Sequence, residues 1–352
     1  MAAVLTPRLG PIGAWFSAAD RLVLRLAFAG VVGFAIALSL HWEFCFLAPM
    51  LAVQIVAAMP VCPNIRQGVT IPLVIFFGTT TAMAAATLLA DAPAVLLLVV
   101  GLVLCWTFYG QRRGAPAIAM LLIQISFAAV PLFSTLSLDT AQTFAEFMQK
   151  SSVAAIIAVW VSHALFPAPK PPAGEASPGP APKPAGLEPA RAARVAITDV
   201  LVLLPLLAKF MIWSDVDDFV ILMITLNLLR EIETVHTGKV AAALLTGNLL
   251  GGVVALVAQQ YILAADNLIQ FLLTIFLAGL WFGGRMVRGG PMAPVFVLAF
   301  ATFLLLIGIA ITPLPGGSEE MFVVRIIKIG LASLYALAAL SLVARSRRGA
   351  DR

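Results

Sequence analysis

Two carboxylates, Asp199 and Asp218, lie in or beside otherwise apolar stretches in the second half of the chain. Burial disfavours the charged form of a carboxylate, so such a group can exchange a proton near neutral pH. We therefore predict Asp199 and Asp218 as candidates for coupling proton movement to transport. A structural ion pair between Asp199 and another helix is an equally open interpretation.

Basic side chains recur near the ends of apolar stretches, where they could hold an anionic group. A cation inside a membrane span is costly and normally faces protein or water. The alternatives are a basic turn on the cytoplasmic side, a long side chain that reaches the lipid headgroups, or an ion pair. The basic residues predicted to contact a substrate are Arg112, Arg113, Lys209, Arg285, Arg325 and Lys328.

Two amides and two tryptophans complete the predicted substrate site. Gln54 and Asn227 occupy matching places in two apolar stretches, where they could bind a substrate or form hydrogen bonds between helices. Trp106 and Trp281 could pack against the apolar body of a substrate. Tryptophans near a membrane surface also serve as anchors in the aromatic belt, so both interpretations stay open.

The usual signatures of enzyme chemistry are missing from the sequence. No GxxxxGK(S/T) phosphate loop and no GxSxG nucleophile motif occurs. The three histidines, His41, His163 and His236, are scattered and show no metal-binding spacing. We therefore expect no catalytic residue, no metal and no cofactor, with energy drawn from an ion gradient or the substrate gradient.

The composition is that of a membrane protein. Hydrophobic residues make up 61% of the chain and charged residues 11%, against about 25% charged in soluble domains. The apolar residues form stretches of about 17 to 25, the length of an α-helix that crosses a bilayer. We predict an all-α polytopic fold with about twelve transmembrane helices. They lie near residues 22–40, 44–60, 70–90, 94–110, 115–136, 147–166, 195–213, 217–230, 238–262, 267–284, 291–312 and 321–344.

The charges between the spans predict the orientation. Acidic residues such as Glu43, Asp91 and Asp139 occupy the odd-numbered turns, whereas arginines such as Arg66 and Arg113 occupy the even-numbered ones. Because basic turns stay in the cytoplasm, both termini are expected there. The same asymmetry explains the net charge of +5, so no nucleic-acid partner is expected.

An internal repeat divides the chain around a proline-rich segment. Arg25 and Trp42 mark the first span of one copy, and Arg194 and Trp213 mark the first span of the other. Six crossings return the chain to the cytoplasm, so the two six-helix repeats are expected to be parallel. The predicted regions are a cytoplasmic segment 1–21, membrane halves 22–166 and 191–344, a cytoplasmic linker 167–190 and a basic tail 345–352.

Two further features predict how the helices meet the bilayer and one another. Arg25 and Arg194, near the starts of the first and seventh spans, are expected to reach the lipid headgroups on the cytoplasmic side. Gly247 and Gly251, four residues apart, are expected to let two helices approach closely.

Together these features resemble the fusaric acid resistance and aromatic acid exporter family. The residues that carry the resemblance are Arg25 with Ala27, Trp42, Gly68 with Gly78, Lys150 with Phe166 and Pro167, and in the second half Arg194 with Ala196, Trp213, Gly238 with Gly247, and Arg325 with Gly330. The resemblance implies a bacterial inner-membrane efflux subunit of twelve spans that exports aromatic or other amphipathic organic acids, driven by the proton gradient. It also implies a periplasmic adaptor of the membrane-fusion type and an outer-membrane channel as partners. Larger members carry sizeable soluble domains after the membrane halves, and we expect this protein to have only the proline-rich linker and a short basic tail in their place.

Three functions remain open at this point, in order of preference. The first is the exporter, with its pathway between the two halves. The second is a membrane scaffold that positions a periplasmic adaptor and transports nothing, so that single replacements of its charged residues would leave its function intact. The third is a passive anion channel, whose flux would ignore a collapsed proton gradient.

Overall fold

The computed structural model describes residues 17–59, 61–167, 186–213, 219–232, 238–263, 267–312 and 335. Within these ranges all regular secondary structure is helical. Eight of the described helices are long and apolar enough to cross a bilayer. The chain is therefore a helical membrane protein with several transmembrane segments.

Six helices precede the proline-rich segment. They are α1 (Ala18–Ser39), α2 (Leu47–Ala58), α3 (Ile65–Leu88), α4 (Pro93–Arg112), α5 (Ala117–Ser134) and α6 (Leu138–Leu165). Polar caps fix the start of three of them, because each cap side chain accepts a backbone N–H that has no partner inside the helix. Ser17 and Asn64 form capping boxes at α1 and α3, and Ser137 caps α6. With this cap, α6 begins well before the span expected from residue 147.

Five further helices follow that segment. They are α7 (Pro189–Trp213), α8 (Phe219–Ile232), α9 (Gly238–Leu263), α10 (Leu268–Arg288) and α11 (Ala293–Ile311), with a short 3-10 turn, Gly290–Met292, before α11. The first eleven expected spans each coincide with a described helix, and within the described residues eight of these helices are found to be long and apolar enough to cross a bilayer. The twelfth, near residues 321–344, lies outside the described residues except for Tyr335. Helix α2, at 12 residues, is the shortest α-helix whose two ends both lie within the described residues.

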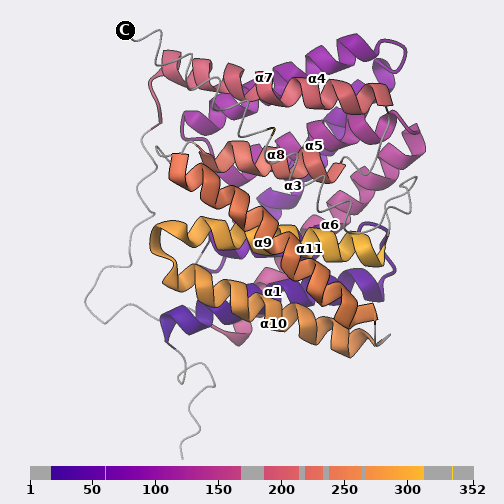
Figure 1. The fold of residues 1–352 in the computed structure, drawn as a ribbon. Helices are drawn as coiled ribbons and strands as arrows, with labels where there is room; N and C mark the ends of the chain where they lie inside the picture. The colour runs from indigo at the N-terminus through magenta and orange to yellow at the C-terminus, as the bar shows by residue number, and fades with distance from the viewer. Residues whose placement is uncertain are drawn as a thin grey trace, which may run out of the picture.

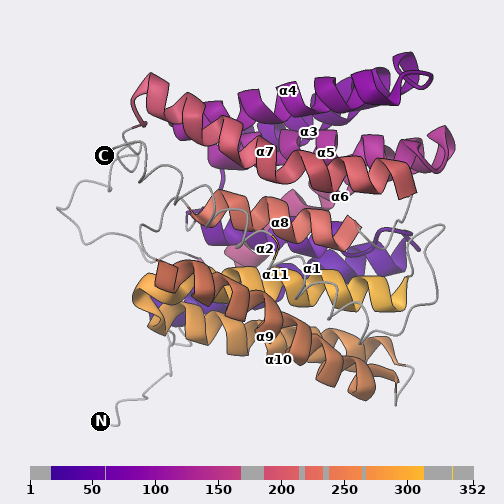
Figure 2. The same ribbon diagram turned by 45° about the horizontal axis from the view of Figure 1, so that its top comes forward.

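The helices lie side by side in a bundle. Figure 1 shows α4 and α7 together at one edge, and α1 and α10 together at the other. Figure 2 shows α2, α8 and α11 between these edges. The helices before the proline-rich segment therefore meet those after it through four main pairs, α1 with α10, α4 with α7, α2 with α11 and α5 with α8.

Glycines make the closest helix contacts. A Cβ added to Gly279 of α10 would lie 2.6 Å from the Cα of Ala27 in α1. Gly251 of α9 lies against the backbone carbonyl of Ala299 in α11, and Gly247, one turn earlier, contacts the same helix. The spacing of Gly247 and Gly251 therefore brings α9 against α11, as the sequence predicts.

Arg25 differs from the expectation that it reaches the lipid headgroups. It is only 2% exposed, whereas Arg194, its counterpart in α7, is exposed. Helix α1 packs against α2, α6 and α10, while α7 packs mainly against α4. The arginine of α1 is therefore covered by protein and does not extend to the surface.

Candidate functional site

A cavity of about 310 Å³ lies between α2, α5, α10 and α11. It is at the end of the bundle where α2 and α10 finish and where α5 and α11 begin. We call this the arginine end, because Arg112, Arg113, Arg285 and Arg288 belong to it. The described residues that line the cavity are Leu51, Gln54, Ile55, Ala57, Ala58, Ile118, Leu121, Leu122, Met286, Ala293, Pro294, Val297, Leu298 and Ala301.

Gln54 is the one polar side chain among these described lining residues. Its Oε1 and Nε2 atoms are buried, and neither has a hydrogen-bond partner in the described part of the chain. A buried polar group left in this state costs about 1–3 kcal/mol. A solute or a water molecule in the cavity would remove that cost by bonding to the amide. The cavity volume is at the lower end of the range of about 300–1,000 Å³ for small-molecule sites.

One face of α11 lines the cavity and also closes its far side. The lining residues from α11 include Pro294, Leu298 and Ala301. Gly308 lies on the same face of this helix, because residues three and four positions apart share one face of an α-helix. A Cβ on Gly308 would lie 3.0 Å from the Cα of Phe46, which precedes α2. Helices α2 and α11 are therefore in close contact toward the opposite end and apart at the arginine end.

Phenylalanines fill the space beside this contact. The rings of Phe133 and Phe144 stack with 4.7 Å between centroids, and Phe44 meets Phe144 at 5.2 Å. Phe219, the first residue of α8, lies 5.3 Å from Phe133 and 6.3 Å from Phe46. All five side chains are fully buried. These five residues, called the phenylalanine cluster below, lie where α2, α6 and α8 begin, which is the end opposite the arginine end.

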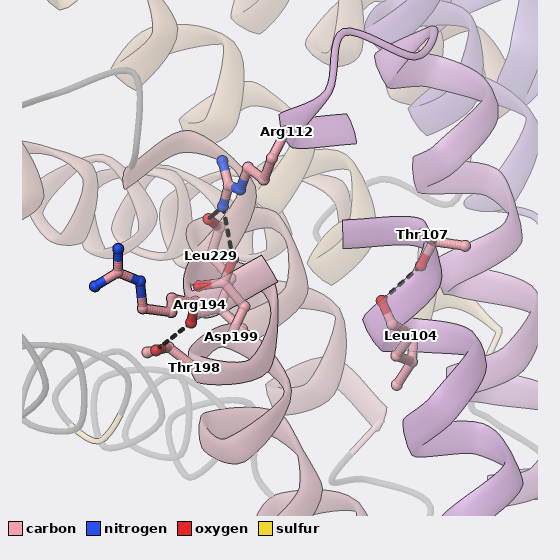
Figure 3. A network of polar contacts seen from close by, with 7 residues as sticks. All are labelled: Leu104, Thr107, Arg112, Arg194, Thr198, Asp199 and Leu229. Atoms are coloured by element: carbon pink, nitrogen blue, oxygen red, sulfur yellow. Dashed lines mark hydrogen bonds and ion pairs between the residues drawn. The ribbon is translucent and has the colours of Figure 1, made fainter. Parts of the chain in front are cut away.

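A buried ion pair joins α4 to α7. Arg112, the last residue of α4, lies 2.8 Å from Asp199 of α7, measured between Nη2 and Oδ2. The same Nη2 donates to the carbonyl of Leu229 in α8 at 3.2 Å. The two charged side chains are 6% and 5% exposed. Figure 3 shows Arg112 reaching from α4 to both acceptors, so one guanidinium connects three helices.

The structural ion pair that the sequence left open for Asp199 is therefore present. Removing one partner of a buried pair leaves the other charge uncompensated, which costs about 3–5 kcal/mol. A proton on Asp199 would likewise remove the negative charge that Arg112 faces. The Oγ1 of the neighbouring Thr198 donates to the carbonyl of Arg194 at 2.8 Å (Figure 3).

The end of the proline-rich segment is fastened to the turn after α4. The N–H of Leu187 donates to the carbonyl of Arg112 at 2.9 Å, and Nη1 of Arg113 donates to the carbonyl of Leu187 at 2.9 Å. These bonds hold the start of α7 beside the end of α4, which brings Asp199 within reach of Arg112. The rest of the predicted linker, residues 168–185, lies outside the described residues.

Other residues predicted to contact a substrate lie on the surface of the bundle. Trp106 and Trp281 are 72% and 42% exposed. The guanidinium carbon of Arg285 lies 5.6 Å from the ring centroid of Trp281, over the ring. Lys209 is exposed on α7, with Nζ 5.2 Å from the ring of the following phenylalanine. The structure thus does not bring these side chains together with Gln54.

Four predicted positions cannot be placed at the site. Asp218, Arg325 and Lys328 lie outside the described residues. Asn227 belongs to α8, but its side chain is not among those described. The candidate site therefore consists of the cavity and the buried ion pair.

Two features of the interior were not predicted from the sequence. The phenylalanine cluster is one, and its signal was the recurrence of phenylalanine at the starts of two corresponding spans, as Phe44 and Phe219. The other is Gln124 of α5, a fully buried amide whose Oε1 and Nε2 have no partner among the described residues. Its signal, a lone amide in an apolar stretch, is the one that identified Gln54.

A second cavity, of about 760 Å³, lies at the opposite end between α1, α9, α10 and α11. His41, Gln259 and Asn267 are on its wall. Its wall also includes Ile307, on the face of α11 that points away from Pro294 and the first cavity. The two cavities therefore lie on different sides of α11.

A family model described as a protein of unknown function (DUF2955) matches residues 22–162. The matched stretch begins in α1 and ends in α6. No curated protein and no solved structure matches the chain. The match therefore assigns no activity, and a function has to be argued from the site.

Proposed function

We propose that this protein is an inner-membrane efflux transporter that exports aromatic or amphipathic organic acids through a pathway between two halves. The first half is α1 to α6. The second is α7 to α11, completed by the span expected near residues 321–344. Both termini lie in the cytoplasm in this proposal, so the arginine end faces the cytoplasm and the phenylalanine cluster faces the periplasm.

The helix contacts support two parallel repeats of six spans. If α7 to α11 repeat α1 to α5, then the contact of α1 with α10 corresponds to that of α7 with α4. Likewise, α2 with α11 corresponds to α8 with α5, and α3 with α5 corresponds to α9 with α11. All six pairs are in contact. A two-fold axis along the membrane normal would produce this pairing.

The cavity beside Gln54 is the observation that carries the proposal. It lies between helices of both halves, and its described walls are apolar with one polar group, as is typical of small-molecule sites. Its far side is closed by the contact of Phe46 with Gly308 and by the phenylalanine cluster. A transporter that is open toward the cytoplasm and closed toward the periplasm has this arrangement.

The length of α2 supports the same site. At 12 residues it is the shortest α-helix whose two ends are both described, and α8 occupies the corresponding position in the second proposed half. In transporters built from repeats, short apolar segments at corresponding positions mark the substrate site. Gln54 lies on α2, and Asn227, its predicted counterpart, lies on α8.

The pair of Arg112 and Asp199 supports coupling to protons. It joins α4 of one half to α7 of the other, and it is buried. Proton uptake by Asp199 would remove the negative charge that Arg112 faces at 2.8 Å and so weaken the contact of α4 with α7. Movement of one repeat against the other is the usual basis of alternating access. We therefore place the proton-sensitive step at this pair, with Asp218 as the second candidate carboxylate.

A periplasmic adaptor and an outer-membrane channel are proposed as partners, following the resemblance to the aromatic acid exporters. The two alternatives have less in their favour. A scaffold that transports nothing does not explain a cavity with an unpaired amide. A passive anion channel does not explain a proton-sensitive ion pair between the proposed halves.

Deletion of the gene tests the proposed function. Cells without it, challenged with a panel of hydroxylated benzoates and fusaric-acid-like compounds, should become more sensitive to at least one and accumulate more of it. The intact gene should restore both. Unchanged sensitivity and accumulation across a broad panel would contradict export. Full restoration by an Asp199→Asn variant made in normal amounts would show that Asp199 is not the coupling carboxylate.

A further inference from the structure

We infer that the cavity binds its solute in an uncharged form, through a head group that presents a hydrogen-bond donor beside an acceptor to Gln54. A primary carboxamide and a protonated carboxylic acid both have such a head. The inference rests on the proposed function, because it assumes that the cavity is the substrate site. It goes further by naming the charge state and the hydrogen-bonding pattern of what is bound.

The first reason is the absence of charge from the described cavity wall. Apart from Gln54, every described lining residue is an alanine, leucine, isoleucine, valine, proline or methionine. Arg285 is next to the lining residue Met286 in the sequence, but its side chain is exposed and stacks on Trp281. Arg112 is engaged by Asp199. A carboxylate in this cavity would lose its hydration without gaining a counter-charge from the described wall, which is unfavourable.

The second reason is the pair of unsatisfied atoms on Gln54. Its Nε2 can donate and its Oε1 can accept, and both atoms are buried without a partner among the described residues. A carboxamide or a protonated acid satisfies both atoms at once through two parallel hydrogen bonds. A carboxylate has only acceptor oxygens, so it would satisfy Nε2 and leave Oε1 facing a second acceptor.

The third reason is size. A volume of about 310 Å³ accommodates a small aromatic solute, and the aliphatic wall offers apolar surface to its ring. Gln54 lies one turn before the end of α2, whereas Ala57, Ala58 and Ala293 lie at the ends of their helices, nearer the arginine end. A solute that enters from the arginine end therefore meets Gln54 after passing apolar side chains.

Benzamide and benzoate have nearly the same shape, so a comparison of their binding shows whether the cavity prefers an uncharged or a charged head group. The purified full-length protein in detergent is equilibrated with radiolabelled benzamide or benzoate near neutral pH, where benzoate is ionised. Equilibrium dialysis in detergent excludes permeation through lipid. We expect benzamide to bind at least about tenfold more tightly than benzoate, because a hydrogen-bonding site discriminates strongly against a head that leaves a buried group unpaired. Equal or tighter binding of benzoate would overturn the inference.

Substitutions of Gln54 and Gln124 test whether Gln54 binds the head group, with Gln124 as the control. Gln54→Leu should lower benzamide affinity by about tenfold or more. Gln124→Leu should leave it unchanged, because Gln124 is also a buried, unpartnered amide but is not among the described lining residues. Gln54→Met serves if the leucine variant does not fold. Unchanged binding in the Gln54 variants, or no benzamide binding to the unaltered protein, would also overturn the inference.

Failure of the inference and failure of the proposed function give different results. If benzoate binds and is exported while benzamide does not bind, the protein is still an exporter of acids, but it binds the anion. If neither ligand binds and deletion of the gene changes no accumulation, both the inference and the proposed function fail, and water alone then accounts for the solvation of Gln54.

Discussion

Phe46 and Gly308 hold the start of α2 against α11 in near-backbone contact. A Cβ on Gly308 would lie 3.0 Å from the Cα of Phe46. Cys45, the preceding residue, lies with its Sγ 3.6 Å from the carbonyl oxygen of Gly308. At the arginine end the same two helices are separated by the cavity. The proposed pathway is therefore closed at one end by packing that leaves no room for a methyl group.

Gly308→Ala should loosen this closed end. The added methyl group has no space beside Phe46, so α2 and α11 must move apart. Cys45, which is fully buried, should then react faster with a membrane-impermeant maleimide. The labelling rate is measured in a protein that also carries Cys62→Ser and Cys105→Ser, which leaves Cys45 as its one cysteine.

Gly30→Ala is the control for this experiment. Gly30 is also a buried helical glycine, but its added Cβ would lie 3.5 Å or more from its neighbours, an ordinary packing distance. Labelling of Cys45 should stay at the basal rate in this variant. Equal labelling rates in the Gly308→Ala and Gly30→Ala proteins would show that the contact with Phe46 does not close this end.

Breaking the pair between Arg112 and Asp199 should destabilise the protein. Arg112→Leu and Asp199→Leu should each cost about 3–5 kcal/mol, because each removes the oppositely charged partner that the remaining buried side chain contacts at 2.8 Å. The double variant should regain most of this stability, since two leucines can pack as an apolar pair. Thermal unfolding in detergent measures the series. A double variant no more stable than either single one would mean that the two charges do not compensate each other.

The double variant also separates proton coupling from a structural role. If Asp199 is the coupling carboxylate, the folded double variant should no longer accumulate substrate in response to a proton gradient. Substrate uptake with and without a protonophore provides the measurement. Proton-driven uptake at the unaltered rate would make the pair structural and leave coupling to another carboxylate, such as Asp218.

The two edge contacts between the halves should differ in their tolerance of a methyl group. A Cβ at Gly279 would lie 2.6 Å from the Cα of Ala27, which is backbone. A Cβ at Gly101 would lie 2.8 Å from Cδ1 of Leu204, which can rotate away. Gly279→Ala should therefore lower the unfolding temperature more than Gly101→Ala. The opposite order would show that the contact of α1 with α10 is the more adaptable one.

The sequence predicted the helices well because a long apolar stretch must form a helix in a bilayer whatever its neighbours are. The eleven described helices fall where apolar stretches were found. Boundaries were less predictable, as α6 shows. Its start at Leu138 is set by the cap at Ser137, which is a local polar signal outside the apolar pattern.

The site was less predictable because it depends on contacts between distant parts of the chain. The sequence identified Asp199 as a buried carboxylate, but its partner Arg112 is 87 residues away and reaches it only through the packing of α4 on α7. Trp106 and Trp281 show a second limit. An aromatic residue in a span has the same sequence signature on the outer face as in the interior, so the sequence left both interpretations open, and the structure shows both side chains exposed.

Uptake into inverted membrane vesicles tests most directly whether the cavity is the transport site. Vesicles containing the unaltered protein should accumulate at least one labelled hydroxybenzoate or its amide, and a protonophore should abolish the accumulation. The Gln124→Leu protein should behave in the same way, whereas Gln54→Leu, made in equal amounts, should lose most of the uptake. Uptake by Gln54→Leu at the unaltered rate, or no uptake of any compound by the unaltered protein, would contradict the account.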